Sequence, residues 1–181
     1  MEVLVVCTGN ILRSPMAQAL LTALARARGL DLVATSAGTL PGERTISPLA
    51  LQALGADAHL VEGHRSRALV ADEIRRADLV LGMTREHVRE IVIADPAAWP
   101  KTFTLKELVR RGSLAGPRRS GEELSDWLAR VGGGRSRQEL LGSADADDVA
   151  DPVGAPASVV KATAAEIRGL LEQLLDLVGD V

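Results

Sequence analysis

Residues 2–15, EVLVVCTGNILRSP, join an apolar run to a loop and a helix start, and this junction decides the fold. The run 2–7 is rich in valine and has no polar residue after Glu2, which is typical of a strand buried on both faces of a parallel sheet. Ser14 followed by Pro15 predicts a helix with serine as its N-cap and proline as its first residue. The loop between them therefore leaves the carboxyl end of a strand, where α/β sheets bind their ligands.

Strands and helices alternate along most of the remaining chain. Further strands are predicted at 31–38, 78–83 and 101–105, and helices at 15–28, 47–55, 70–77, 84–95, 106–111 and 157–178. Such alternation predicts an α/β fold with three layers, in which helices flank a parallel sheet on both faces. The binding site is expected in the loop after the first strand.

The alternation breaks between about residues 112 and 147, which are rich in glycine, serine and arginine. Within this segment Ser120 and Glu123 match a capping box and predict a helix that begins there. Trp127 lies on the apolar side of that helix. We expect residues 1–181 to form a single domain with an inserted helical and flexible segment at about 112–147.

The composition of the chain bears on its binding partners, its compartment and its source. The formal net charge is −3, so the charge does not predict binding to nucleic acid or to a membrane surface. The apolar runs are shorter than the roughly 18 residues of a membrane span, and the single cysteine permits no intramolecular disulfide. Arginine, alanine and glycine are common, which is typical of a GC-rich bacterial genome. We expect a cytoplasmic bacterial protein, a monomer or weak dimer, with no metal or other cofactor.

The loop after the first strand has the residues of a phosphate-binding cradle. Gly9 and Asn10 both tolerate a positive φ, so the chain can curl and turn successive N–H groups toward one point. The helix that follows adds its free amides and the positive end of its dipole. Arg13 can bind two phosphate oxygens with its planar fork. We expect the phosphate loop to comprise Thr8, Gly9, Asn10, Ile11, Leu12 and Ser14.

Cys7 lies at the base of this cradle. Free N–H groups, a helix N-terminus and a guanidinium favour a thiolate, and Ser14 can donate a hydrogen bond to it. This predicts a nucleophile that attacks phosphorus and forms a thiophosphate. In the alternative interpretation, Cys7 is a small apolar residue of a core strand and Arg13 is a solvated side chain.

A leaving group needs a proton, and the water that releases phosphate must lose one, so a carboxyl group is required. Asp151 is favoured, because Pro152 restricts the backbone after it and the last helix follows. Asp145, Asp147 and Asp148 remain competitors on sequence alone.

Five segments, VVCTGNILRSPMAQAL, TSAG, HRSR, ADLVLGMT and DVADP, occur in the order and spacing of the low-molecular-weight protein-tyrosine phosphatases. The chain resembles this family, whose superfamily includes protein-arginine phosphatases and thioredoxin-coupled arsenate reductases. The resemblance implies a four-stranded parallel, twisted sheet with helices on both faces. It implies Cys7 as nucleophile, Arg13 as phosphate ligand and Asp151 as general acid. It also implies a left-handed Asn10, held by Ser36 and His64.

Two loop residues bear on the substrate. Many members of the family have a second cysteine where this chain has Leu12, and its absence argues against arsenate reduction. Ile11 matches the tyrosine-type members, whereas arginine-specific members tend to have threonine there. We therefore expect a phosphatase of phosphotyrosine in proteins or peptides, with protein-arginine phosphatase as the alternative and arsenate reductase or a non-catalytic phosphate-binding module behind them. Few aromatic residues are present, so stacking on the tyrosine ring is expected to be weak or to come from Trp127.

Overall fold

The computed structural model describes residues 1–40 and 42–179. Its centre is one sheet of four parallel strands in the order β2-β1-β3-β4. The strands are β1 (Glu2–Cys7), β2 (Val33–Gly38), β3 (Leu79–Gly82) and β4 (Thr102–Thr104). Strand β1 therefore has β2 on one side and β3 on the other, so the chain runs from β1 to β2 in one direction and then crosses from β2 to β3 in the opposite one. Ligands bind at such a switch point, outside the carboxyl ends of the strands.

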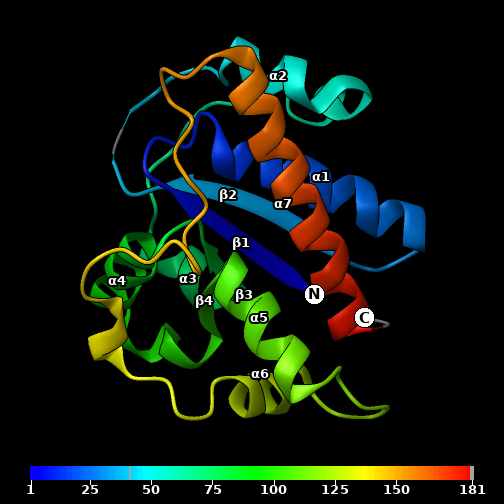
Figure 1. Ribbon diagram of the computed structural model, residues 1–181, viewed down its shortest axis with the longest axis vertical. Helices are drawn as coiled ribbons and strands as arrows, with labels where there is room; N and C mark the ends of the chain where they lie inside the picture. The colour runs from blue at the N-terminus through cyan, green and yellow to red at the C-terminus, as the bar shows by residue number, and fades with distance from the viewer. Residues whose placement is uncertain (41, 180–181) are drawn as a thin grey trace.

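Seven α-helices and three short 3₁₀ helices surround the sheet within the described residues (Figure 1). The α-helices are α1 (Arg13–Arg28), α2 (Pro48–Leu54), α3 (Ala71–Arg76), α4 (Arg85–Ala94), α5 (Leu105–Ala115), α6 (Leu124–Val131) and α7 (Ala157–Val178). The 3₁₀ helices are η1 (Gly55–Leu60), η2 (Pro96–Lys101) and η3 (Arg137–Leu140). In this part of the chain, no helix has the length and apolar character needed to cross a membrane.

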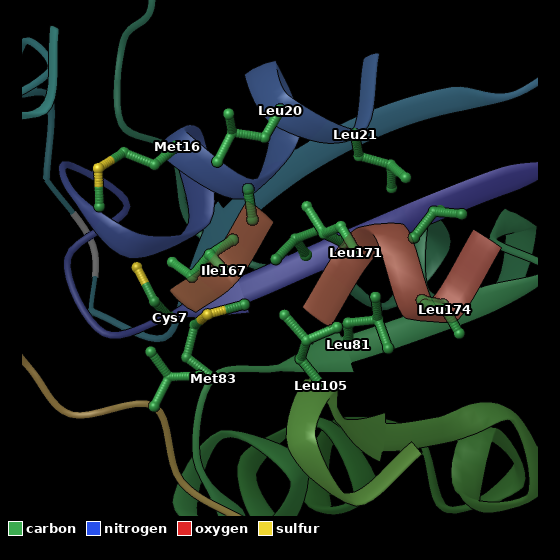
Figure 2. Packing of buried hydrophobic residues seen from close by; sticks show 14 of the residues in the cluster. Cys7, Met16, Leu20, Leu21, Leu81, Met83, Leu105, Ile167, Leu171 and Leu174 are labelled. Atoms are coloured by element: carbon green, nitrogen blue, oxygen red, sulfur yellow. The ribbon is translucent and has the colours of Figure 1, made fainter. Parts of the chain in front are cut away.

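The alternation of side chains along β1 builds a core on each face of the sheet. Val3 and Val5 belong to the larger core, together with apolar residues of α1, α5 and α7. Figure 2 shows Cys7 at the end of this cluster. Leu4 and Val6 belong to the smaller core, with Ile74 of α3 and other residues of α4 and η2. The predicted parallel sheet between helical layers is confirmed, because each face of β1 is buried under a different set of helices.

Two local expectations are wrong. Helix α1 begins at Arg13, and its N-cap residue is Leu12, not Ser14. Pro15 is then the third helical residue, which it can be because the first amides of a helix have no partner within it. Helix α6 likewise begins only at Leu124, and its N-cap side chain forms no capping hydrogen bond.

Trp127 does not line a cleft. Its side chain has no solvent exposure and belongs to the larger core, and its Nε1 donates to the carbonyl oxygen of Gly116 at 3.0 Å. The expectation that it contacts a substrate ring is therefore wrong. Segment 112–147 contains the end of α5, then α6 and η3, and α6 lies below α5 in Figure 1. An amphipathic helix that buries its tryptophan against α5 explains the apolar pattern of this segment.

Candidate active site

A cavity of about 180 Å³ opens at the carboxyl end of β1. It is lined by Cys7, Thr8, Gly9, Ile11, Leu12, Arg13, Leu40, Arg44, Asp151 and Val153. Most of the loop residues predicted from the sequence are therefore on its wall. Asn10 and Ser14 of the loop lie outside this lining, and so do Ser36 and His64, which contact Asn10.

One left-handed residue turns the loop. Asn10 has a φ of 50°, and it is the sole non-glycine residue with positive φ in residues 1–40 and 42–179. Gly9 does not have a positive φ, contrary to its expected part in the curl. Gly38, at the end of β2, is the glycine that the curl requires. A Cβ added there would lie 2.7 Å from the carbonyl oxygen of Thr8, so a larger residue would displace the loop.

Hydrogen bonds hold Asn10 in this conformation. Its Nδ2 donates to the Oγ atoms of Ser14 and Ser36, each at 2.9 Å. Its Oδ1 accepts from the backbone N–H of Arg67 at 3.1 Å, and its carbonyl oxygen lies 2.7 Å from Nε2 of His64. The two residues that the resemblance assigned to this support, Ser36 and His64, thus both contact Asn10. The bonds offset the cost of a left-handed conformation in a residue with a Cβ.

Cys7 ends β1 and is almost completely buried, with 3% of its surface exposed. Its Sγ lies 3.0 Å from Oγ of Ser14, which is inside the first turn of α1. The hydroxyl of Ser14 thus contacts Sγ of Cys7 and accepts from Nδ2 of Asn10, and it does not cap the helix. A serine hydroxyl beside sulfur can donate to a thiolate, which is the negatively charged, nucleophilic form of cysteine.

Arg13 reaches across the cavity from the first residue of α1. Its guanidinium donates to the carbonyl oxygen of Val149 at 3.0 Å and to Oδ2 of Asp151 at 2.6 Å. The side chain is 4% exposed. Its Nε is buried and has no hydrogen-bond partner among the described residues 1–40 and 42–179. A buried donor without a partner is costly, and an anion bound in the cavity would satisfy it.

Asp151 alone among the four candidate aspartates lines the cavity. Its side chain is 43% exposed, and Oδ1 accepts from the backbone N–H of Val153 at 3.2 Å. Asp148 uses its carboxylate to accept backbone N–H groups, including that of Arg85 at 2.8 Å. Asp145 is exposed outside the cavity. The fold thus separates Asp151, which the sequence favours, from the three aspartates that remain its competitors on sequence alone.

Asp147 anchors the segment that carries Asp151. It is buried, and its two carboxylate oxygens bind the guanidinium groups of Arg85 and Arg110, at 2.6 and 2.7 Å. Burial alone would raise the pKa of Asp147, but the hydrogen bonds and charges of Arg110 and Arg85 outweigh it and hold that pKa below its ordinary value. The segment also donates from Val149 N–H to the carbonyl oxygen of Met83 at 2.8 Å, which ties it to the end of β3.

One buried residue near the loop escapes sequence reasoning. His87 of α4 is 2% exposed, and its Nε2 lies 3.0 Å from Oγ1 of Thr8. The sequence could have indicated His87 only through its position in the first turn of the helix after β3. The carboxyl ends of parallel strands meet at one edge of a sheet, so this turn lies near the loop that follows β1. In the described residues, no group of three or more histidine, cysteine, aspartate or glutamate side chains is arranged to hold a metal ion.

Known proteins are similar to this chain in sequence and in architecture. A sequence profile described as "Low molecular weight phosphotyrosine protein phosphatase" matches residues 2–124. The chain is 33% identical over 175 residues to a protein-arginine-phosphatase of Bacillus subtilis, covering 96% of this chain and 94% of that protein. It is 36% identical over 106 residues to EpsP of Ralstonia solanacearum, a probable low-molecular-weight protein-tyrosine-phosphatase, covering 59% of this chain and 71% of that protein.

A solved structure agrees with these sequence matches. The low-molecular-weight protein tyrosine phosphatase from T. tengcongensis superimposes with a TM-score of 0.73 and 33% identity. The match covers 97% of this chain and 98% of that one, so it includes the segment that carries Asp151 and the final helix.

Proposed function

The chain belongs to the low-molecular-weight phosphotyrosine protein phosphatase family, and from this premise we propose that it removes phosphate from phosphotyrosine in proteins through a phosphocysteine intermediate. As a member of this family it is a hydrolase of phosphate monoesters. The observation that carries the proposal is the cavity at the end of β1, which Cys7, Arg13 and Asp151 line together.

Phosphate binding would use the loop and Arg13. The buried Nε of Arg13 would donate to one phosphate oxygen, and a terminal nitrogen released from Asp151 would donate to a second. Such a bidentate contact fixes the orientation of the phosphate as well as neutralising its charge. The helix N-terminus that begins at Arg13 adds free amides to the same end of the cavity.

The reaction would proceed in two displacements. The thiolate of Cys7 attacks phosphorus, an S–P bond forms, and the P–O bond to the leaving group breaks. Asp151, in its acid form, gives a proton to the departing oxygen. A water molecule then attacks phosphorus and loses its proton to the Asp151 carboxylate, and the S–P bond breaks to release inorganic phosphate and the thiolate.

The rim of the cavity supports phosphotyrosine as the substrate. Ile11, Leu40 and Val153 give it apolar side chains, and Leu40 and Val153 are more than half exposed, at 55% and 61%. An aromatic ring gains free energy by covering such side chains. The charged side chains on the wall are Arg13, Arg44 and Asp151, so cations outnumber carboxylates. A guanidinium-bearing substrate would find a single carboxylate, that of Asp151, beside the two arginine side chains of the wall.

Phosphoarginine is a second candidate, and the relatives favour it. Two protein-arginine-phosphatases, from Bacillus subtilis and Geobacillus stearothermophilus, match 96% and 97% of this chain. The tyrosine-type relative EpsP matches 59% of it, although the solved tyrosine phosphatase from T. tengcongensis covers 97%. The rim and the relatives therefore support different substrates, and a direct comparison is needed.

Peptides of one sequence, carrying either phosphotyrosine or phosphoarginine, provide that comparison. We expect a higher kcat/KM for the phosphotyrosine peptide. Ile11→Thr should lower that value by about tenfold, since an apolar contact of this size discriminates by roughly 1–3 kcal/mol. The measurement is phosphate release under initial-rate conditions, in a buffer that contains a chelator.

Ile93→Thr is the matched control for this comparison, because Ile93 is 68% exposed on α4 and lies outside the cavity. It should leave both rates unchanged. A faster reaction with phosphoarginine, together with an unchanged phosphotyrosine rate in Ile11→Thr, would transfer the assignment to the arginine-type activity.

The role of Asp151 makes a separate prediction. Asp151→Ala should lower kcat for phenyl phosphate by about 10²–10⁴-fold, the usual contribution of a general acid. The loss should be much smaller for p-nitrophenyl phosphate, whose leaving group needs little protonation. Steady-state rates of the two esters give the ratio that reports proton transfer.

Asp145→Ala is the control for Asp151→Ala, since Asp145 is an exposed aspartate of the same segment outside the cavity. It should leave the ratio of the two rates at its wild-type value. Equal losses on both esters in Asp151→Ala would assign the acid to another residue and leave Asp151 only the contact with Arg13.

A further inference from the structure

We propose that His87 is a positioning residue for the phosphate loop, which it holds in place through the side chain of Thr8. The proposal rests on the proposed function of the cavity and deepens it. Thr8 follows Cys7 directly and lines the cavity, whereas His87 lies behind the loop on α4. The contact joins residues 79 positions apart in the chain, at 3.0 Å between Oγ1 of Thr8 and Nε2 of His87.

The donors and acceptors of this contact follow from the other ring nitrogen. The backbone N–H of Thr84 donates to Nδ1 of His87 at 3.0 Å. A backbone amide can only donate, so Nδ1 is an acceptor and the hydrogen of the neutral ring lies on Nε2. His87 therefore donates to Oγ1 of Thr8, and both ring nitrogens are satisfied although the residue is buried.

The ring acts by geometry and not by charge. Burial, together with the positive charge of Arg13, lowers the pKa of His87 from 6.5 to about 3. The imidazole is therefore neutral near pH 7, and its single hydrogen is directed at Thr8. A neutral ring leaves the attraction between Arg13 and a phosphate undisturbed.

The first turn of α4 is a firm base for this contact. Gly82 ends β3 where an added Cβ would lie 3.1 Å from the carbonyl oxygen of Thr84 and 3.2 Å from Cβ of His87, so the turn packs tightly against the strand. Arg85 in the same turn donates its backbone N–H to Asp148 and its guanidinium to Asp147. The turn therefore contacts both the phosphate loop and the segment that carries Asp151.

Two substitutions separate the functions of the two ring nitrogens. In His87→Asn, the amide oxygen can replace Nδ1 as the acceptor for Thr84, but the shorter side chain does not reach Thr8. In His87→Gln, the amide nitrogen can replace Nε2 and donate to Thr8. A role in positioning the loop predicts damage from asparagine and rescue by glutamine, whereas a role only in capping α4 predicts the reverse.

The test is a double-mutant cycle of His87→Asn and Thr8→Val, with His87→Gln beside it. Inorganic phosphate is titrated into each protein by calorimetry, and kcat/KM is measured with p-nitrophenyl phosphate. Each single substitution should weaken phosphate binding by about 2- to 10-fold, the range of one hydrogen bond. The double variant should be no weaker than the weaker single one, because both remove the same contact. His87→Gln should stay within about twofold of the wild type.

The outcomes are distinct. Additive losses in the cycle, or glutamine as damaging as asparagine, would overturn the positioning role of His87. A wild-type chain that binds phosphate but hydrolyses no ester would overturn the proposed function alone, and the cycle on phosphate affinity would still decide the role of His87. A wild-type chain that binds no phosphate would overturn both. Thermal unfolding of each variant identifies one that fails to fold, in which case the effect of Thr8→Val alone decides.

Discussion

Cys7→Ser should abolish turnover of aryl phosphates, with a loss on the order of 10⁴-fold or more, as for other nucleophiles that act as part of a unit. A serine hydroxyl at this position can still approach Ser14, which lies 3.0 Å from the present sulfur, so the loop should keep its shape. The hydroxyl is, however, scarcely ionised near neutral pH and is a far weaker nucleophile than a thiolate. Phosphate release from p-nitrophenyl phosphate in the presence of a chelator measures the loss.

Retained phosphate binding is the control for this variant. Calorimetric titration with inorganic phosphate should give an affinity within a few-fold of the wild type, because Arg13 and the loop amides are unchanged. Cys7→Ala should be equally inactive. Residual hydrolysis above a few per cent in either variant would contradict the assignment of Cys7 as the nucleophile.

Arg13→Lys should lower kcat/KM by roughly 10²–10³-fold, the usual cost of removing a donor directed at developing charge. Lysine keeps the positive charge but presents it at one point, so it cannot contact two phosphate oxygens and the carbonyl oxygen of Val149 together. KM should rise and kcat should fall, since the fork binds phosphate in the ground state and in the transition state. Steady-state kinetics with p-nitrophenyl phosphate separates the two.

Arg44→Lys is the matched control, because Arg44 lines the same cavity with an exposed side chain. It should change kcat/KM by a few-fold at most, as expected of an exposed charge. An Arg13→Lys variant as active as Arg44→Lys would show that charge alone suffices and that the planar fork is not required.

Local patterns predict most of the fold. The first strand at 2–7 and the last helix at 157–178 have the observed bounds, because an unbroken apolar run and a 3.6-residue apolar period each identify one element. The start of α1 is missed, because Ser14 has the sequence features of an N-cap while its hydroxyl contacts Cys7 and Asn10. A side chain that serves a site breaks the local rule for its type.

The site is less accessible to sequence reasoning where it depends on long-range contacts. Cys7, Thr8 and Arg13 lie in one continuous loop, so their proximity follows from the chain itself. Asp151 and His87 come to the same place only through the order of the strands and the ion pairs of Asp147. Four neighbouring aspartates differ in their partners in space, and no property of their spacing reveals those partners.

Helix α7, which packs against α1, α2 and α5, has a consequence for synthesis on the ribosome. Its apolar residues, among them Ile167 and Leu171, complete the larger core around β1, yet they are translated after every other element described. Domains fold as units, so the nascent chain holds an open sheet face until α7 emerges. Asp151 also emerges late, just before that helix. A growing polypeptide therefore contains the cysteine loop long before it has either its carboxylate or its closed core.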